Sequence, residues 1–588
     1  MIEVLQLFLF ESLLLVCAYL LASLFLDELK LTMGIVISYV LLFQLFFYFQ
    51  ILQIPITLQN ALCVIVPLLA ILIGIHKKLK IKTFTRPCFE IKENRLEVYV
   101  LLAFFTILAY RLFQYPVTGS DTVFRWDFLG RQIFNQQHFT YYPAFDSADY
   151  HFYFWTESIP PLVSFKYLWS YLSAGSINPR YTFINVLMQF FAIASFLFAA
   201  VKLKFGEKLA WQSILLLLSC GVLVSATGIN QETGLTTLCV CGLLFYSQKA
   251  ELKYGDIIAM ALCASLGALC REYGGIFVLI ASVLLIKRIS LRQYLVFLAI
   301  IFTLSAPWYI YVWIKCNNPF YSIKIGELFN YNPVHNSIMD VYKDKFYATW
   351  QSALLVTIKT KYFLFISPFL LSIAILIRFN KSYWRMYCAI AILFGLWLIS
   401  IPKTASMAFS TRLLTTLCPF IVFMIICYYK KYFSRAFIIT ISFLAILNAA
   451  IFPFKFSQIT KPEFWNTYTI IPNEVNAMDK IYYEFRDYSM TILSDDAYAY
   501  AASNKYKNIT VVPVWRPDLQ FIFDQDLSLI EIYSKLKKKG IHYIQFYPWS
   551  TNAAFLVKSK LYKDMKQWRL LAKGTVFQLY DISKKLPE

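Results

Sequence analysis

Long apolar windows recur along the whole chain, and they restrict its possible folds more than any other feature. A helix needs about 20 apolar residues to cross the roughly 30 Å hydrocarbon layer of a membrane. About fourteen windows approach that length, and hydrophobic residues make up 59% of the chain. The sequence therefore predicts a polytopic α-helical membrane protein, with windows at 2–26, 33–53, 58–75, 96–113, 181–201, 209–228, 232–247, 255–270, 274–286, 293–314, 351–377, 386–400, 412–428 and 436–453.

Lys and Arg residues are concentrated in every second connector between these windows. Basic connectors remain on the cytoplasmic side of a membrane. The connectors between them, such as 229–231 and 271–273, are short and contain few Lys or Arg residues. The orientation of each window follows from the basic connectors, which are HKKLKIKTFTRPCFEIKENR, KLKFGEK, QKAELKY, KRISLR, RFNKSYWR and KKYFSR.

This alternation places three large segments and the N-terminus on the external side. The segments are the connector 114–180, the loop 315–350 and the tail from residue 455. Charged residues at the ends of several windows are expected on the same side, close to these segments. They are Glu232, Arg271, Glu272 and Arg412.

The net charge of +21 arises largely in the basic connectors, so we interpret it as a determinant of orientation and expect no nucleic-acid partner. The first window lacks a preceding basic segment and a small-residue cleavage site, which predicts a retained span rather than a signal peptide. Most of the twelve cysteines lie inside apolar windows and show no metal-ligand spacing. They predict neither a disulfide framework nor a structural zinc site.

The chain divides into three parts by composition. Residues 1–95 hold the first windows and a basic loop, and residues 96–454 form the main transmembrane core. Residues 455–588 are less apolar and alternate short β-rich runs with helical segments, one of which ends at Gly540. This order predicts a small extracytoplasmic α/β domain with a parallel or mixed sheet, and its position suggests that it shapes or covers a site.

The stretch Thr118–Pro161 is polar and aromatic, although it lies between two apolar windows. Charged groups at the edge of a membrane are costly unless they are used or paired. Within it, Asp121 and Arg125, and likewise Asp127 and Arg131, are spaced i,i+4 as on one helix. A helical spacing of 100° per residue places the two aspartates about 120° apart, so they are expected to face different surroundings.

Four short segments resemble motifs of the GT-C glycosyltransferases, which include protein O-mannosyltransferases, the aminoarabinose transferase of lipid A and oligosaccharyltransferase. The acidic segment SDTVFRWDF lies in the first large external connector, as the acidic motif of that family does. It contains two separated aspartates rather than an adjacent acidic pair, so Asp121 and Asp127 both remain candidates for the catalytic carboxylate. The other three segments are IPPLVSFKYLW, APWYIYVWIKCNNPF and STRLLTTLCPF.

This resemblance implies a GT-C-like core and an active site that faces the periplasm or exterior of a bacterial inner membrane. A carboxylate, Asp121 or Asp127, would deprotonate the acceptor for attack on a sugar carried by polyprenyl phosphate, and Arg271 or Arg412 would hold the phosphate. A divalent ion, Mg or Mn, is possible at the acidic motif, but no cofactor is required by the sequence. Further candidates for substrate contacts are Glu232, Glu272, Asp149, His151 and Glu157.

The leading hypothesis is therefore a membrane glycosyltransferase with a lipid-linked sugar donor and a lipid, glycan or protein acceptor. A polymerase or ligase of envelope polysaccharide is the nearest alternative. A lipid or oligosaccharide flippase is the alternative from another class, and it would require paired halves or charges in the middle of the membrane. Neither is evident in the sequence, where ionisable residues are expected at the ends of the windows.

Overall fold

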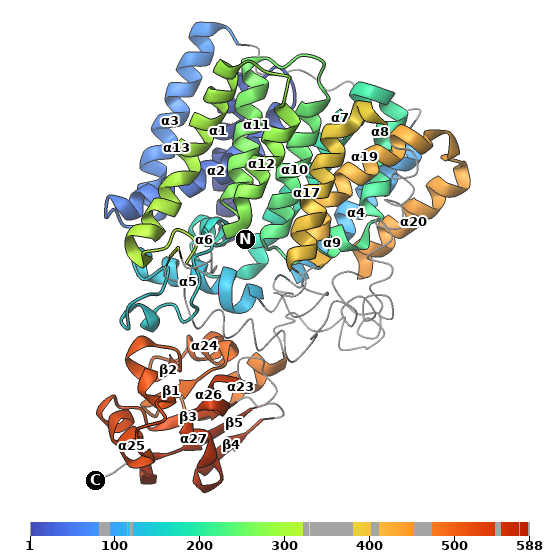
Figure 1. The fold of residues 1–588 in the computed structure, drawn as a ribbon. Coiled ribbons are helices and arrows are strands. Elements are labelled where there is room, and N and C mark those ends of the chain that lie inside the picture. Colours follow the sequence, from blue (N-terminus) through green and yellow to red (C-terminus); the bar gives the residue numbers. More distant parts are fainter. Residues whose placement is uncertain are drawn as a thin grey trace.

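The computed structural model describes residues 2–81, 94–114, 116, 121–321, 328–329, 380–400, 411–451, 473–546, 554–574 and 577–585. A large helical bundle is followed by a small α/β domain, which lies at one end of the bundle (Figure 1). The predicted domain boundary at residue 455 and the loop after residue 321 fall largely outside these residues.

Eight helical segments of the described chain are long and apolar enough to cross a membrane. These segments comprise α1 (Ile2–Ser23), α2 (Lys30–Ile51), α3 (Leu58–Leu79), α4 (Arg95–Gln114), η3 (Pro179–Thr182) with α7 (Phe183–Phe205), α13 (Leu291–Cys316), η5 (Lys381–Tyr383) with α17 (Trp384–Ser400), and η7 (Thr411–Leu417) with α19 (Cys418–Tyr429). Shorter helices complete the bundle: α10 (Glu232–Gln248), α11 (Tyr254–Ala268), η4 (Glu272–Gly274) with α12 (Gly275–Leu285), η8 (Lys430–Tyr432) and α20 (Arg435–Ile451). The chain is thus a polytopic helical membrane protein.

The predicted windows coincide with these helices, apart from 351–377, which lies outside the described residues. The sequence predicts one continuous helix for the window 209–228, but the structure contains two helices there. The window forms α8 (Glu207–Leu218) and α9 (Gly221–Gly228), which are bent by 68° relative to each other. The bend occurs because Cys220 adopts an extended backbone, with ψ of 98°, between the two helices.

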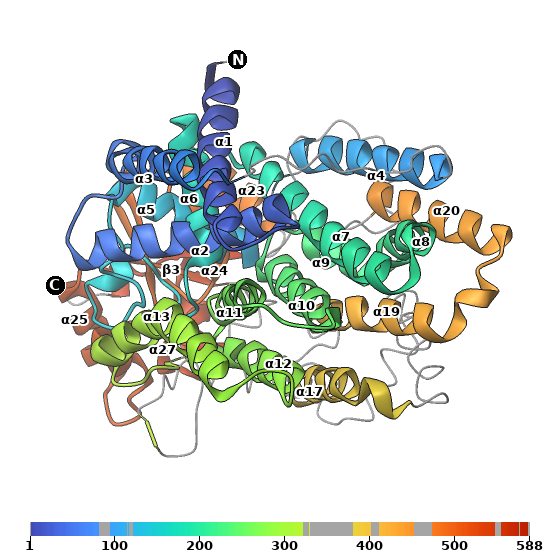
Figure 2. The ribbon, with the colours of Figure 1, turned by 90° about the horizontal axis from the view of Figure 1, so that it is seen from above.

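Helix α10 forms the centre of the bundle and is buried along nearly its whole length. It packs between α7 and α11, and Figure 2 shows α12 on one side of it and α7 on the other. A helix that is apolar all round belongs in the interior of such an assembly. Its first residue, Glu232, is therefore presented at the end of the bundle by a well-packed helix.

The basic connectors meet at one end of the bundle. Lys249 forms ion pairs with Glu28 at 2.7 Å and with Asp256 at 2.6 Å. Arg288 donates to the Ser247 carbonyl at 2.5 Å, which joins two further connectors at this end. These contacts place the basic connectors 248–254 and 287–292 at the same end of the bundle as the connector between α1 and α2.

The remaining connectors meet at the opposite end, together with the N-terminus. The Glu3 carboxylate accepts a hydrogen bond of 2.5 Å from the Tyr181 hydroxyl, which follows the connector 114–180. Lys315, at the end of α13, pairs with Asp149 of the same connector at 3.1 Å. These contacts place the N-terminus, the connector 114–180 and the end of α13 at one end of the bundle, whereas most of the predicted loop 315–350 lies outside the described residues.

The C-terminal domain contains a five-stranded mixed sheet in the order β2-β1-β3-β5-β4. The first three of these strands are parallel, and β5 pairs antiparallel with β3 and β4. The predicted succession of strand, helix, strand, helix and strand is confirmed, and Gly540 has a φ of +69° where α25 ends. The elements are α23 (Asn473–Glu484), β1 (Met490–Ser494), α24 (Ala497–Ser503), β2 (Ile509–Pro513), η9 (Pro517–Phe523), α25 (Leu529–Lys538), β3 (Tyr543–Phe546), α26 (Ala554–Lys558), α27 (Lys560–Lys563), η11 (Met565–Gln567), β4 (Arg569–Lys573), β5 (Gln578–Asp581) and η12 (Ser583–Lys585).

Strand β4 was not predicted. Its sequence, RLLAK, consists of residues that favour helices in isolation. Pairing with β5 overrides that local preference, because four of the five residues of β4 lie opposite a residue of β5 and gain cross-strand contacts there.

Aromatic side chains hold this domain against the connector 114–180. The Trp515 indole donates to the Phe154 carbonyl at 2.6 Å, and the Phe154 ring stacks on Tyr500 with centroids 4.2 Å apart. Phe124 meets Tyr498 of α24 edge to face at 5.9 Å. The domain therefore packs directly on the segment that carries the acidic motif.

We expect the α/β domain and the connector 114–180 to be exposed on the same, external side of the membrane. Single cysteines at Ala148 and Gln525, both exposed, should react with a membrane-impermeant thiol reagent in intact cells. A cysteine at Lys253, whose side chain is 80% exposed at the basic end, should react only after permeabilisation. The parent chain controls for native thiols, and labelling at only one of the first two positions would contradict the topology.

Candidate functional site

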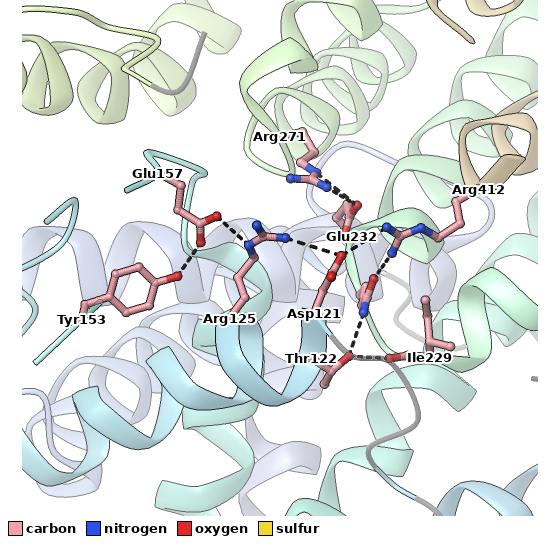
Figure 3. Close-up of polar contacts among 10 residues, drawn as sticks. Asp121, Thr122, Arg125, Tyr153, Glu157, Ile229, Glu232, Arg271 and Arg412 are labelled. Atoms are coloured by element: carbon pink, nitrogen blue, oxygen red, sulfur yellow. Dashed lines mark hydrogen bonds and ion pairs between the residues drawn. The ribbon is translucent and has the colours of Figure 1, made fainter. Parts of the chain in front are cut away.

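Six charged residues from separate segments meet where the bundle contacts the α/β domain (Figure 3). We call this group the arginine–carboxylate cluster. It combines the acidic motif with the start of α10, the residues that follow α11 and the start of η7. Its members are Asp121, Arg125, Glu157, Glu232, Arg271 and Arg412.

Asp121 is the carboxylate that links two arginines in this cluster. Its Oδ2 lies 3.2 Å from Nη2 of Arg412 and 3.5 Å from Nη1 of Arg125. Its side chain is 23% exposed, so the carboxylate remains open to a ligand. Burial opposes its ionisation, but the guanidinium groups of Arg412, Arg125 and Arg271 outweigh burial and hold the pKa of Asp121 below its ordinary value.

The helix that carries Asp121 contains a π-helical turn, η1 (Thr122–Trp126), before α5 (Asp127–Gln136). The Asp127 N–H bonds the Thr122 carbonyl, an i→i+5 contact. Such turns are rare and frequently occur at functional sites. Asp121 is the first described residue of this helix.

Arg412 lies at the start of η7 and contacts two different groups. One guanidinium nitrogen reaches Asp121, and the other donates to the side-chain carbonyl of Gln231. Gln231 in turn donates to the Thr122 hydroxyl at 2.9 Å. Gln231 was not among the predicted site residues, because an amide that precedes a helix carries no charge or spacing signal in the sequence.

Arg271 and Glu232 form the second ion pair of the cluster. Nη2 and Nε of Arg271 lie 2.9 and 3.0 Å from Oε1 of Glu232. The other carboxylate oxygen, Oε2, is buried and has no hydrogen-bond partner within the described part of the chain. The ring of Trp126 lies 5.8 Å from the guanidinium carbons of both Arg125 and Arg271, which provides a cation–π contact to each.

Glu157 is fully buried and contacts Arg125 through a different nitrogen from the one that contacts Asp121. Its Oε2 lies 2.6 Å from Nε of Arg125, and Tyr153 donates its hydroxyl to Oε1. Burial raises the pKa of Glu157 despite the opposing influence of Arg125 and Tyr153. This geometry makes Glu157 an anchor for Arg125, whereas the sequence proposed it as a substrate contact.

Asp127, the alternative catalytic carboxylate, lies outside the cluster. It pairs with Arg131 at 2.7 Å and accepts the Tyr171 hydroxyl, and its side chain is only 4% exposed. The predicted i,i+4 ion pairs are both present, and the two aspartates face different surroundings as expected. Asp121 is open to a ligand, whereas Asp127 is enclosed by protein.

The remaining candidates occupy different positions. Glu272 is buried in η4, directly after Arg271. Asp149 accepts the backbone N–H groups of Phe145 and Asp146 and pairs with Lys315, which shapes the connector. His151 lies exposed at the end of the short helix η2 (Asp149–His151).

A divalent ion does not fit the residues around Asp121. Within the ranges that the structure describes, no group of three or more His, Cys, Asp or Glu side chains could hold a metal. The immediate neighbours of the Asp121 carboxylate are guanidinium groups, which already compensate its charge and would repel a cation.

One ionisable pair contradicts the expectation that charges lie only at the ends of windows. Glu11, near the middle of α1, lies 3.5 Å from Lys166 of α6 (Leu162–Ala174), and both side chains are 4% exposed. The sequence analysis overlooked this pair because its members are 155 residues apart. Since each charge is compensated by the other, the pair provides no open binding position of the kind a transporter needs.

Comparisons with known proteins give matches among solved structures only. No family model and no curated protein matches the chain. A solved structure, that of ArnT from Cupriavidus metallidurans in the apo state, is similar over 84% of this chain and 99% of its own, with 12% identity and a TM-score of 0.46. We therefore base the functional proposal on the residues of the cluster.

Substitution of Asp127 tests its structural role. Asp127→Asn would leave Arg131 without its ion pair, and we expect the unfolding free energy to fall by about 1–3 kcal/mol. Thermal unfolding of the purified full-length protein measures this loss. Asp146→Asn, at an exposed position of the same connector, is the matched control and should change the midpoint little; equal stability of both variants would contradict the assignment.

Proposed function

We propose that the protein is a GT-C-type membrane glycosyltransferase that transfers a sugar from polyprenyl phosphate to an acceptor hydroxyl at the external membrane surface. The observation that carries this proposal is the partly exposed Asp121 carboxylate, held between Arg412 and Arg125 at the end of a membrane-spanning bundle. A base and fixed cations within a few ångströms of each other match the two needs of this reaction.

In this reaction Asp121 accepts the proton of the acceptor hydroxyl as its oxygen attacks the anomeric carbon. The new bond joins that carbon to the acceptor oxygen, and the bond between the carbon and the phosphate oxygen breaks. Polyprenyl phosphate leaves with the bonding electron pair, and the proton on Asp121 passes to the leaving phosphate or to water. The developing charge on the phosphate is the charge that an arginine fork stabilises.

Arg412 is the best-placed arginine for this phosphate. Arg271 is engaged with Glu232 through two nitrogens, and Arg125 is held by Glu157. Arg412 instead shares Asp121 with Arg125, and its second described partner, Gln231, is neutral. A phosphate at Arg412 would therefore meet a guanidinium group whose carboxylate neighbour, Asp121, is also held by Arg125.

Donor binding would also make Asp121 a stronger base. The low pKa of Asp121 depends on nearby guanidinium groups, with Arg412 the strongest of them. A phosphate bound to Arg412 would compensate that positive charge and raise the pKa of the carboxyl. Proton abstraction would then be favoured only once the donor is in place.

Glu232 provides a contact for the sugar in this proposal. Its Oε2 is buried beside Arg271 and lacks a hydrogen-bond donor among the described residues. An orphaned carboxylate oxygen is costly. A hydroxyl group of the donor sugar would supply the missing hydrogen bond.

Cells with and without the gene test the function itself. Mass spectrometry should show loss of one surface glycan modification and accumulation of its polyprenyl-phosphate sugar in the deletion strain. Purified protein should then transfer that sugar from the isolated lipid to the unmodified acceptor. A flippase would not catalyse transfer in detergent, and a polymerase would lengthen chains rather than add one residue.

Replacing each aspartate in turn distinguishes the proposed base, Asp121, from the alternative, Asp127. Removing a general base typically lowers the rate by about 10²- to 10⁴-fold, so Asp121→Asn should lose most turnover while still binding the donor. Asp127→Asn, compared at a temperature where it is folded, should retain turnover. The reverse pattern would identify Asp127 as the base, and normal turnover in both would refute a catalytic role for the acidic motif.

The role of Arg412 is tested by the conservative change Arg412→Lys. Lysine keeps the charge but lacks the planar fork, and loss of a charged hydrogen bond costs about 1.5–3 kcal/mol. We expect weaker donor binding and lower turnover by about 10- to 100-fold. Arg131→Lys, which alters an arginine outside the cluster, is the control; unchanged donor affinity in Arg412→Lys would exclude phosphate binding by this residue.

A further inference from the structure

A second charged cavity lies at the basic end of the bundle, opposite the arginine–carboxylate cluster. It has a volume of about 260 Å³ and is bordered by the ends of α7 and α10, the connector from α12 to α13, and the start of η5 and α17. Four cationic side chains line it, together with the hydroxyl-bearing residues Ser382 and Tyr383. The cations are Lys204, Lys249, Arg288 and Arg385.

The charges of this cavity are only partly compensated. Lys249 pairs with Glu28 and Asp256. Arg288 bonds instead to the neutral carbonyls of Ser247 and Lys249, and Arg385 donates to the Ile286 carbonyl at 2.9 Å. Within the described chain no ion pair involves Lys204, Arg288 or Arg385, so these three positive charges converge without a carboxylate.

The two arginines also repel each other. Burial, and then the positive charge of the neighbouring Arg385, lower the pKa of Arg288. Both arginines are only partly buried, and their like charges oppose each other within one cavity. A bound anion would compensate both guanidinium groups and accept their remaining N–H donors.

We propose that this cavity binds the phosphate group of an anionic phospholipid. The guanidinium fork suits phosphate oxygens, and basic pockets between membrane helices on the cytoplasmic side bind such headgroups. Exposed apolar side chains flank the cavity at the same level, among them Leu203 at 52%, Ile286 at 43% and Trp384 at 36% exposure. They provide a surface for acyl chains, which a free phosphate ion would leave unused.

The proposal is tested with full-length protein in neutral detergent by native mass spectrometry. Phosphatidylglycerol should bind the parent protein, and the double variant Lys204→Gln/Arg385→Gln should bind it about 30-fold more weakly, since each basic residue contributes about 5-fold near a membrane surface. The control Lys77→Gln/Lys78→Gln removes the same charge from exposed positions that do not line the cavity and should bind the lipid as the parent does.

Two further measurements, a single variant and a competition with phosphate, complete the test. Arg288 is left unchanged because it also bonds the carbonyls at the end of α10. If the double variant does not fold, Lys204→Gln alone, at an exposed position, should still weaken binding about 5-fold. Equal lipid binding by parent and folded variant would overturn the site, and displacement of phosphatidylglycerol by millimolar inorganic phosphate would overturn the lipid in favour of free phosphate.

Discussion

Ion pairing between arginines and carboxylates at one end of the bundle is the interaction on which the proposed site depends. Charges close to a membrane interior are stable only when compensated. Asp121, Glu157 and Glu232 each meet an arginine from a different segment, and Asp121 meets two. The packing of η1, α10, η4 and η7 is therefore tied to one electrostatic network, and a change in any member alters the others.

The network also explains how Asp121, although a weak base, could accept a proton once the donor phosphate is bound. In the unliganded protein the arginines keep Asp121 ionised, but they make it a poor proton acceptor. Glu157 fixes Arg125 from the buried side, so that arginine cannot turn away from the carboxylate. Arg412 contacts Asp121 directly, and its engagement by a phosphate would change the basicity of that carboxylate.

Arginine side chains have different partners at the two ends of the bundle. At the end that carries the arginine–carboxylate cluster, every arginine of the cluster has a carboxylate within 3.5 Å. At the basic end Arg288 and Arg385 have backbone carbonyls as described partners. The first arrangement suits a reaction in which charge is redistributed, and the second suits a permanently bound anion. The aromatic contacts of Tyr498, Tyr500 and Trp515 hold the α/β domain against the end that carries the cluster.

Local patterns in the sequence determined the helical windows, the end of the bundle at which each connector lies, the Asp121–Arg125 spacing and the order of elements in the tail. These features depend on hydrophobicity, charge and helical period within short segments. Only the tertiary structure decided that Asp121, rather than Asp127, is open beside Arg412, a partner 291 residues away. It also decided the burial of Glu157, the bend after Leu218, strand β4 and the Glu11–Lys166 pair. Each of these features depends on packing between different segments, which the periodicity of a single segment does not predict.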